Sequence, residues 1–357
     1  MKKNMFQRIE VVTMNNEYEK RMNWADNLKV LGIFLVVFGH CYTINNGIRQ
    51  YVYSFHVPLF FFLSGLFFNS GKYTNFKSLV VKKSKSILVP YFLFSAITYL
   101  CWIIVFRRIE GNLIMVNPMQ PLLGILYSNA IGNWMIYDGP LWFLTCLFLV
   151  ELEYYFINKY KKMNLLLILI LFSIIGFIDS KYMMFRFPWS LDVSFTAIVF
   201  YGLGNLFKLN SKKIIYLFLN KKNSLIVCLI FLTFSITFSI LNGPIDMNLN
   251  ILGNIIYFYI SSLSGIAFYL ILFICFLDCK FKLIEFIAKN TIIIMALHGM
   301  ILNLTKGILF FEFKIPKYLL SQNPFVSFTV SVICIFILIP IIKFINMYMP
   351  FLIGRKN

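Results

Sequence analysis

Residues 28–38 read LKVLGIFLVVF, an apolar run that only Lys29 interrupts. Two longer runs, at residues 87–106 and 326–342, contain no charged side chain. With its flanks, each run approaches or exceeds the roughly 17–25 residues that an α-helix needs to cross a bilayer. The whole chain is 60% hydrophobic and only 13% charged, whereas soluble domains carry roughly 25% charged residues. The sequence therefore predicts an all-α polytopic membrane protein.

Apolar segments divide the chain into about ten expected transmembrane helices. Their expected limits are residues 28–45, 51–70, 87–107, 139–158, 163–180, 190–208, 223–241, 251–277, 290–310 and 324–350. We expect one membrane domain over residues 28–350, between an N-terminal segment (1–27) and a short tail (351–357), both cytoplasmic. The stretch 121–136 is also apolar, and we expect it to be re-entrant or interfacial rather than a further span.

The Lys and Arg residues of the loops give these helices a direction. Every second loop, counting from the N-terminal segment 1–27, is basic, and these loops carry 20 Lys and Arg residues against 6 in the alternate loops. Because cytoplasmic loops of membrane proteins are enriched in Lys and Arg, we expect both termini in the cytoplasm. The same bias explains the formal net charge of +19 without nucleic acid as a partner.

The chain contains three His residues, His40, His56 and His298, and all three fall inside expected helices. A His in a membrane helix is costly unless it faces the bundle interior or a wet cavity, so each is a functional candidate. A helix–helix hydrogen bond is the alternative for any one of them. Because all three His residues fall in expected membrane helices, a functional role is favoured. The Cys residues are scattered singly and form no Cys/His cluster with ligand spacing, so no metal site is expected.

The first expected helix carries Lys29 and His40 eleven residues apart. At about 100° per residue the two side chains differ by about 20° and share a face, and about 16 Å of helix separates them. With the expected direction, Lys29 lies near the cytoplasmic mouth and His40 in the outer half of one groove. Asp26 projects about 40° away from His40 and could pair with Lys29. The alternative for Lys29 is snorkelling to the interface.

Five stretches, taken together and in order, resemble one known family. They are NLK at 27–29 with FGH at 38–40, YSFHVPLFFFLSG at 53–65, GPLWFL at 139–144, FYGLG at 200–204, and AKNT at 288–291 with LH at 297–298. This pattern resembles the membrane acyltransferase 3 family, which includes bacterial surface-polysaccharide O-acetyltransferases and fucose 4-O-acetylase-like proteins. The family's first-helix motif, a basic residue followed by ten others and a His, matches Lys29 and His40.

The resemblance implies an enzyme of the bacterial cytoplasmic (inner) membrane. It implies transfer of an acetyl group from cytoplasmic acetyl-CoA, a co-substrate, to a hydroxyl of a surface or lipid-linked glycan such as a lipopolysaccharide O-antigen. His40 would be the catalytic residue together with Lys29. A His can take a proton from a hydroxyl near neutral pH, or it can accept the acetyl group as a covalent intermediate. Both routes remain open at this point.

One departure from the family concerns the donor side. The family carries an R-x-x-R motif before a Pro-Tyr, whereas the stretch before Pro90 reads KKSKS at residues 82–86. Lys82 and Lys85 keep the spacing, and a register one residue later would use Lys83. The lysines keep the positive charge that would attract the phosphates of coenzyme A, but they lack the bidentate geometry of Arg. We expect Asp26 and these three Lys residues to serve the donor.

For the acceptor side the candidates are His56, Trp142 and His298. Trp142 has an equally good alternative as an interfacial belt residue. Glu151 and Glu153 fall in the same expected helix, and an ionised Glu inside a membrane needs a partner, so we expect a neighbouring Lys or His beside one of them.

A transporter or flippase for a glycan or small polar solute is the alternative function. Many helices and intramembrane His residues suit both functions. The basic cytoplasmic mouth beside a groove that carries His favours the acyltransferase, because a coenzyme A donor needs positive charge and a neutral solute does not.

Overall fold

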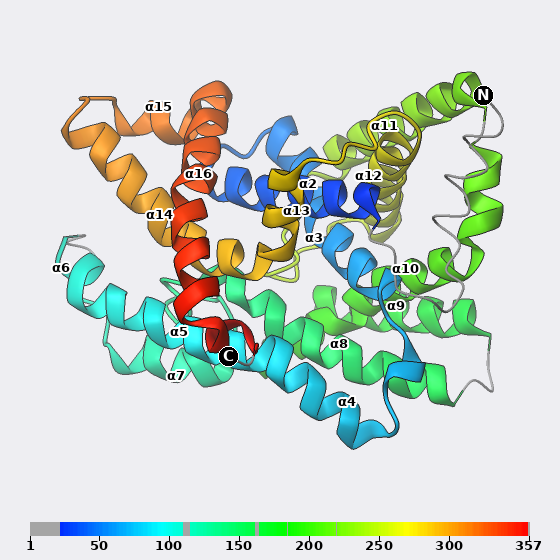
Figure 1. Cartoon of the computed structure of the whole chain (residues 1–357), viewed down its shortest axis with the longest axis horizontal. Coiled ribbons are helices and arrows are strands. Elements are labelled where there is room, and N and C mark those ends of the chain that lie inside the picture. Colours follow the sequence, from blue (N-terminus) through cyan, green and yellow to red (C-terminus); the bar gives the residue numbers. More distant parts are fainter. Residues whose placement is uncertain (1–21, 110–114, 161–163, 184, 219, 356–357) are drawn as a thin grey trace.

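The computed structural model describes residues 22–109, 115–160, 164–183, 185–218 and 220–355. Within these ranges the regular elements are helices, and the one β feature is an isolated antiparallel bridge between Asp246 and Ile251. The helices cross one another at many angles around a buried centre (Figure 1). This architecture confirms the predicted all-α class.

Nine described helical segments are long and apolar enough to cross a membrane. They contain α2 (Asn23–Cys41), the continuous run Phe76–Phe106, α8 (Trp142–Lys159), α9 (Leu165–Tyr182), α10 (Leu191–Leu217), α11 (Lys221–Asn242), α12 (Ile255–Cys275), α14 (Thr291–Phe311) and α16 (Pro324–Tyr348). Each coincides with a helix expected from hydropathy. The multi-pass membrane character of the chain follows from these helices.

The helix α3 (Gly47–Leu66) corresponds to the remaining expected span. Its 20 residues measure about 30 Å, which matches the thickness of a bilayer core. Arg49, Gln50 and His56 lie within it and lower its mean hydropathy below that of the other nine segments. Polar side chains inside a helix of this length point to a buried, functional position.

The other described elements, and the parts that make up the run Phe76–Phe106, are short. They are α4 (Phe76–Lys83), the π-helical turns η2 (Ser84–Leu88) and η3 (Trp102–Phe106), α5 (Val89–Cys101), α6 (Arg107–Ile109), α7 (Met119–Tyr127), η5 (Gly139–Leu141), η6 (Pro188–Ser190), α13 (Lys282–Lys289), α15 (Lys317–Gln322) and η7 (Pro350–Ile353), besides η1 (Ser70–Lys72). The nine residues of α7 rise only about 13 Å. The helix in the apolar stretch 121–136 is therefore too short to cross a bilayer.

Asparagine side chains begin five of the long helices. The Ncap amide oxygen in each accepts hydrogen bonds from backbone N–H groups of the first turn, which satisfies donors that the helix leaves unpaired. These caps are Asn46 of α3, Asn164 of α9, Asn220 of α11, Asn254 of α12 and Asn323 of α16. The sequence thus marks the starts of these helices locally.

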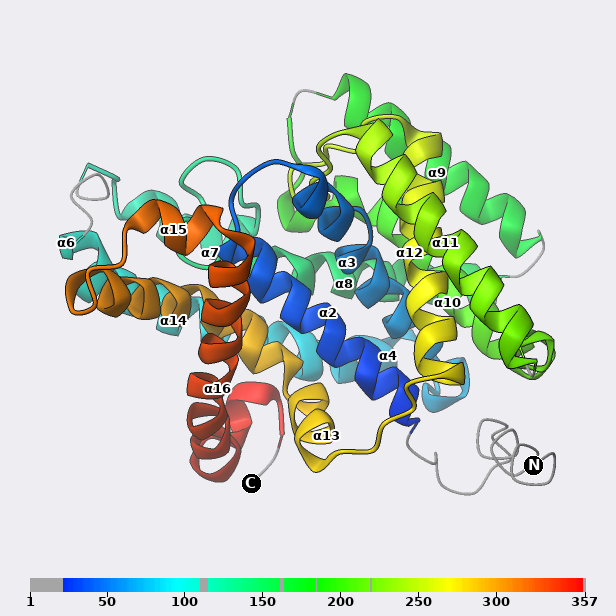
Figure 2. The same cartoon turned by 90° about the horizontal axis from the view of Figure 1, so that it is seen from above.

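The helix α2 lies at the centre of the molecule, whereas α9 and α11 lie at its edge (Figure 2). Of the apolar window in α2, 72% is buried, against 17% in α9 and 22% in α11. The exposed faces of α9 and α11 carry Leu and Ile side chains. An apolar face of this kind suits lipid, so the edge helices contact the membrane while α2 is shielded from it.

Glycines allow α3 and α10 to cross very closely. A Cβ on Gly65 would lie 1.8 Å from the carbonyl oxygen of Tyr201, and one on Gly204 would lie 2.0 Å from that of Phe62. Small residues at helix crossings let backbones approach in membranes. Both glycines belong to motifs singled out in the sequence, and their place at this crossing gives them a packing role.

Proline in α3 is accommodated by a neighbouring helix. Pro58 has no N–H, so the carbonyl of Ser54 loses its helical partner. The hydroxyl of Ser262 on α12 donates to that carbonyl at 2.6 Å. A similar adjustment precedes Pro90, where the N–H of Val89 bonds the carbonyl of Ser84, five residues back, and forms the π-helical turn η2. The carbonyl that Pro58 leaves without its helical partner is thus satisfied by a protein group.

Candidate active site

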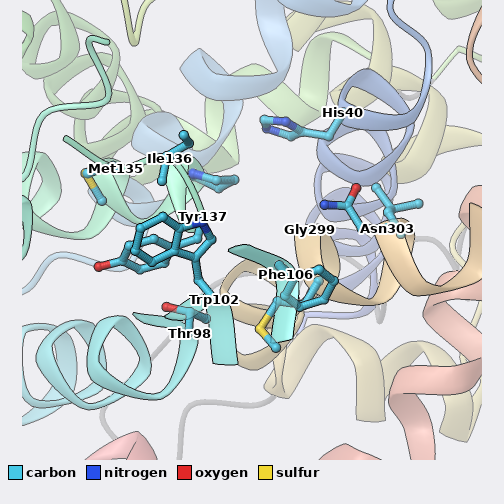
Figure 3. A pocket seen from close by; sticks show the side chains of 13 residues that line it. His40, Thr98, Trp102, Phe106, Met135, Ile136, Tyr137, Gly299 and Asn303 are labelled. Carbon is cyan, nitrogen blue, oxygen red and sulfur yellow. The ribbon is translucent and has the colours of Figure 1, made fainter. Parts of the chain in front are cut away.

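A cavity of about 260 Å³ opens beside the C-terminal end of α2 (Figure 3). Four segments that are distant in sequence enclose it, namely α2, the end of α5 with η3, the loop before α8, and the middle of α14. The lining residues are His40, Thr98, Trp102, Phe106, Met135, Ile136, Tyr137, Gly139, Pro140, Gly299, Met300, Leu302 and Asn303. One residue predicted to be catalytic therefore lies in the cavity wall.

His40 lies in the last turn of α2, next to His298 of α14. The two ring centroids are 5.1 Å apart. His40 is exposed to the cavity, whereas His298 is fully buried behind it. The structure thus brings together two rings from positions 258 residues apart in the chain, and His56 also interacts electrostatically with His40.

Backbone contacts determine which nitrogen of His298 carries its hydrogen. Nδ1 lies 3.0 Å from the carbonyl oxygen of Ile294 and 2.9 Å from that of Met295. A carbonyl can only accept, so Nδ1 is the donor and Nε2 of the neutral ring is an acceptor. Nε2 is buried and has no hydrogen-bond partner in the described part of the chain. His298 therefore presents an unused acceptor beside His40.

His56 is fixed in the same way on α3, because its Nδ1 lies 2.7 Å from the carbonyl oxygen of Val52. Its ring is 4.9 Å from that of Tyr53, whose hydroxyl donates to the carbonyl of Gly39 at 3.3 Å. A Cβ on Gly39 would lie 2.9 Å from the Tyr53 ring. Glycine before His40 thus allows Tyr53 and His56 to approach the end of α2.

Two cations that the sequence analysis did not single out also lie near His40. Lys306 of α14 donates to the carbonyl of Cys41 at 3.0 Å and to the hydroxyl of Ser321 at 3.2 Å. Arg49 donates to the hydroxyl of Tyr53 at 3.1 Å. Both interact electrostatically with His40. Lys306 was detectable, because an ionisable residue inside an apolar segment is a functional candidate by default.

Aromatic rings form the wall of the cavity that faces His40 (Figure 3). Trp102 and Tyr137 are stacked, with ring centroids 5.8 Å apart and planes 27° apart. Trp102 and Phe106 belong to η3, where the N–H of Arg107 bonds the carbonyl of Trp102 across a wide π turn. No sequence motif pointed to these residues, since aromatic side chains are common throughout the chain.

A buried carboxyl group lies behind this wall, in the loop before α8. Asp138 is 3% exposed, its Oδ2 accepts a hydrogen bond from the Thr98 hydroxyl at 3.4 Å, and its Oδ1 has no partner in the described part of the chain. Burial raises the pKa of Asp138 to about 7. Water stabilises a carboxylate far better than this apolar loop does, so the neutral form is favoured.

Trp142 does not line the cavity, although Gly139 and Pro140 just before it do. Its ring is 4% exposed and packs in the core, with the Phe143 ring 6.3 Å away. The burial argues against a belt residue at the membrane interface, since a belt ring would contact lipid headgroups. A role for Trp142 toward the acceptor stays a prediction.

At the other end of α2 the geometry involves lysines. Lys83 Nζ lies 2.6 Å from Oε1 of Glu151, which is 3% exposed. This pair confirms that one of the two Glu residues of α8 has a Lys partner. Glu153, the second, accepts a hydrogen bond from the hydroxyl of Ser194 at 2.8 Å.

Further lysines gather around the C-terminal end of α3. The ammonium of Lys29 lies 4.4 Å from the centroid of the Phe67 ring, and Lys208 donates to the carbonyl of Phe68 at 3.2 Å. The C-terminal end of a helix carries partial negative charge, so it attracts these cations. Lys208 was not among the predicted donor residues.

We call Lys29, Lys83 and Lys208 the lysine cluster. The other residues predicted to bind the donor are Lys82, Lys85 and Asp26. Lys82 is exposed and donates to the carbonyl of Lys72 at 2.8 Å, and Lys85 is exposed on η2. Asp26 is buried in the first turn of α2. Of the three lysines in the KKSKS stretch, Lys83 is the one engaged with a buried group. Whether Lys82 with Lys85, or Lys83, serves the donor stays a prediction.

One of three comparisons with known proteins finds a match. The family model described as an acyltransferase domain matches residues 22–344. No curated protein and no solved structure matches the chain. The matched residues include the central helix α2, with Lys29 and His40, and the helix α14, which supplies His298. This chain belongs to the membrane acyltransferase 3 family.

Proposed function

We propose that this membrane acyltransferase moves an acetyl group from acetyl-CoA to a hydroxyl of a surface or lipid-linked glycan. One observation carries the proposal: a single buried helix, α2, bears His40 beside a cavity at one end and Lys29 near a lysine cluster at the other. Eleven residues separate the two positions, which is about 16 Å along the helix.

The lysine end suits the donor. Coenzyme A carries several phosphate charges, and Lys29, Lys83 and Lys208 gather around the C-terminal end of α3. The exposed Lys82 and Lys85 add positive charge nearby. A Lys ammonium binds phosphate as a point charge. In this proposal the lysine end faces the cytoplasm of a bacterial inner membrane, with both termini on that side, as the loop charges favour.

At the cavity end His40 acts as the base. The imidazole takes the proton of the acceptor hydroxyl, the hydroxyl oxygen attacks the thioester carbon, the carbon–sulfur bond breaks, and the CoA sulfur receives the proton. His298 supports this role, because its Nε2 is an acceptor without a partner beside the His40 ring. An N–H of His40 directed at that acceptor leaves the other His40 nitrogen free to take the proton. Transfer through an acetyl-His40 intermediate uses the same contacts in two steps.

The test is mass spectrometry of surface glycans from the source bacterium. Deleting the gene should remove the mass increment of acetyl groups, and the wild-type gene should restore it. His40→Ala should fail to restore it while the protein is still found in the membrane, because a general base typically contributes about 10²–10⁴-fold. Full glycan acetylation by the His40→Ala variant would contradict the proposal. Purified protein that transports a glycan or solute but binds no acetyl-CoA would favour the transporter instead.

A further inference from the structure

We propose that Arg49 and Tyr53 of α3 are positioning residues for His40, because with Lys306 of α14 they hold the C-terminal end of α2 in place. This assignment rests on the proposed function, in which His40 is the base. We call the three side chains Arg49, Tyr53 and Lys306 the α2 cap. None of the three is among the residues that line the cavity, so each acts on His40 through the backbone of α2.

The last turn of α2 ends without a backbone cap. Helices commonly end with a residue in the left-handed conformation, which turns N–H groups back to the last carbonyls, whereas Tyr42 is extended, with φ −90° and ψ 112°. The N–H of Thr43, which would bond the carbonyl of Gly39 in a continuing helix, donates instead to the carbonyl of Ser321 at 2.9 Å. The carbonyls around His40 therefore need donors from other groups.

Side chains of two neighbouring helices supply those donors. The Tyr53 hydroxyl donates to the carbonyl of Gly39 at 3.3 Å, and the Lys306 ammonium donates to the carbonyl of Cys41 at 3.0 Å. The two residues that flank His40 in the chain are thus each bonded by a side chain of another helix. A cation suits this position, since the C-terminal end of a helix carries partial negative charge.

Arg49 gives the Tyr53 hydroxyl its direction. The guanidinium donates to the Tyr53 hydroxyl oxygen at 3.1 Å and lies 4.5 Å from the centroid of the same ring. A Tyr hydroxyl has one hydrogen, and since the oxygen accepts from Arg49, that hydrogen is directed at the carbonyl of Gly39. Arg49 also donates to the carbonyl of Thr43 at 2.9 Å, just beyond the helix. It therefore supports the end of α2 both directly and through Tyr53.

Gly39 explains why the last turn needs this support. Glycine destabilises a helix, because it loses more conformational freedom on folding than any other residue. A Cβ at this position would lie 2.9 Å from the Tyr53 ring, so glycine is what lets the ring approach. The residue that weakens the turn thus also admits the side chain that holds it. The direction of the next side chain, His40, follows from this packing.

The experiment uses the full chain in inverted membrane vesicles from the source bacterium with its gene deleted, in which the natural acceptor is present. Each variant is expressed there, and incorporation of labelled acetyl groups into glycan gives kcat and KM for acetyl-CoA. The same variants in lipid nanodiscs are followed by hydrogen exchange and mass spectrometry, which report how often the last turn of α2 opens.

Tyr53→Phe keeps the ring and removes the hydroxyl. We expect kcat to fall severalfold while KM for acetyl-CoA stays unchanged, and exchange in the last turn of α2 to quicken while its first turns exchange as before. Tyr51→Phe is the matched control, because Tyr51 lies on the same helix and its hydroxyl bonds that of Tyr269 on α12 at 3.4 Å. This control should match wild type in both measurements.

Arg49→Met removes the contacts of the guanidinium. We expect kcat to fall about tenfold, further than in Tyr53→Phe, because hydrogen bonds from charged groups contribute more than those between neutral groups. Arg49→Lys should regain part of that loss, since an ammonium can still donate to one of the carbonyls. KM for acetyl-CoA should stay unchanged in both variants.

The outcomes distinguish this inference from the proposed function. Wild-type vesicles that transfer no acetyl group, or a His40→Ala variant with full activity, would overturn the proposed function and with it the catalytic importance of the α2 cap. An inactive His40→Ala variant beside a Tyr53→Phe variant with wild-type kcat would overturn the positioning role alone. So would a Tyr53→Phe or Arg49→Met variant that loses activity through KM, or without faster exchange in the last turn, since the residue would then act on a ligand.

Discussion

The two ends of α2 differ in the kinds of polar group that surround them. At the Lys29 end, Lys83 is paired with the carboxylate of Glu151, and Lys208 bonds a helix C-terminal carbonyl. At the His40 end, no carboxylate lines the cavity, and Nε2 of His298 and Nε1 of Trp102 have no partners among the described residues.

This difference indicates two kinds of ligand. A lysine ammonium can bind a phosphate oxygen as it binds a carboxylate or carbonyl oxygen here, so the lysine end suits an anionic ligand. Unpartnered neutral donors and acceptors suit an uncharged molecule, because hydrogen bonds are what they lack. The end with cations is therefore assigned to coenzyme A and the end with imidazoles to the acceptor, and three variants test this division.

The largest effect is expected for Lys83→Gln at the lysine end. Removing the ammonium should raise KM for acetyl-CoA at least tenfold, or about 1.4 kcal/mol, with a smaller change in kcat, because the contact to phosphate is made equally in the ground and transition states. Steady-state kinetics with labelled acetyl-CoA measures both parameters. Lys77→Gln, on the exposed face of α4, is the control. A drop confined to kcat would assign Lys83 to the chemistry instead.

A smaller effect on activity is expected for Lys306→Met at the His40 end. The variant removes both hydrogen bonds from the ammonium, including the one to the carbonyl of Cys41. Hydrogen bonds to charged groups contribute about 1.5–3 kcal/mol each. We expect a lower melting temperature and a kcat reduced severalfold, because the residue next to His40 loses its support, while KM for acetyl-CoA changes little. Lys343→Met, on an exposed face of α16, serves as the comparison. A change in KM for acetyl-CoA alone would mean that Lys306 serves the donor. The two ends of α2 would then not bind different ligands.

The smallest effect on activity is expected at Asp138, whose buried carboxyl group is tested through the pH dependence of stability. Its folded-state pKa of about 7 lies above the value of about 3.9 for an unfolded Asp. The native protein therefore keeps a proton that the unfolded chain releases, so the contribution is full below about pH 4 and is lost as the pH rises through about 7.

Melting temperatures between pH 5 and pH 8 measure this contribution. The wild type should lose stability across that range, by up to about 1.4 kcal/mol per pH unit, and Asp138→Asn should flatten the profile. Glu312→Gln, at an exposed position, should retain the wild-type slope. An unchanged slope in Asp138→Asn would mean that Asp138 is ionised in the folded protein.

Much of this fold can be predicted from short stretches of the sequence. The long helices coincide with apolar runs, because the bilayer core requires about 20 apolar residues per helix whatever their neighbours. His40, His56 and His298 could be singled out because polar side chains are rare in such runs. Proline removes one backbone donor wherever it stands in a helix, so the loss at Pro58 is also a local property.

What surrounds His40 could not be derived in this way. Lys306 and Trp102 approach it from helices 266 and 62 residues further along the chain, and such contacts depend on how whole helices cross. The same holds for Lys83, whose inward direction depends on the π turn η2 and on the position of α8.

The sequence by itself determined that this is a membrane protein with Lys29 and His40 on one face of a helix, because hydropathy and helical periodicity are properties of consecutive residues. Only the tertiary structure decided that His298 lies beside His40, that aromatic rings face them across a cavity, and that Lys83 is the engaged lysine. Those relations come from the packing of α14 against α2 and α5 and from the packing of η2 against α8, which bring together residues that the chain holds far apart.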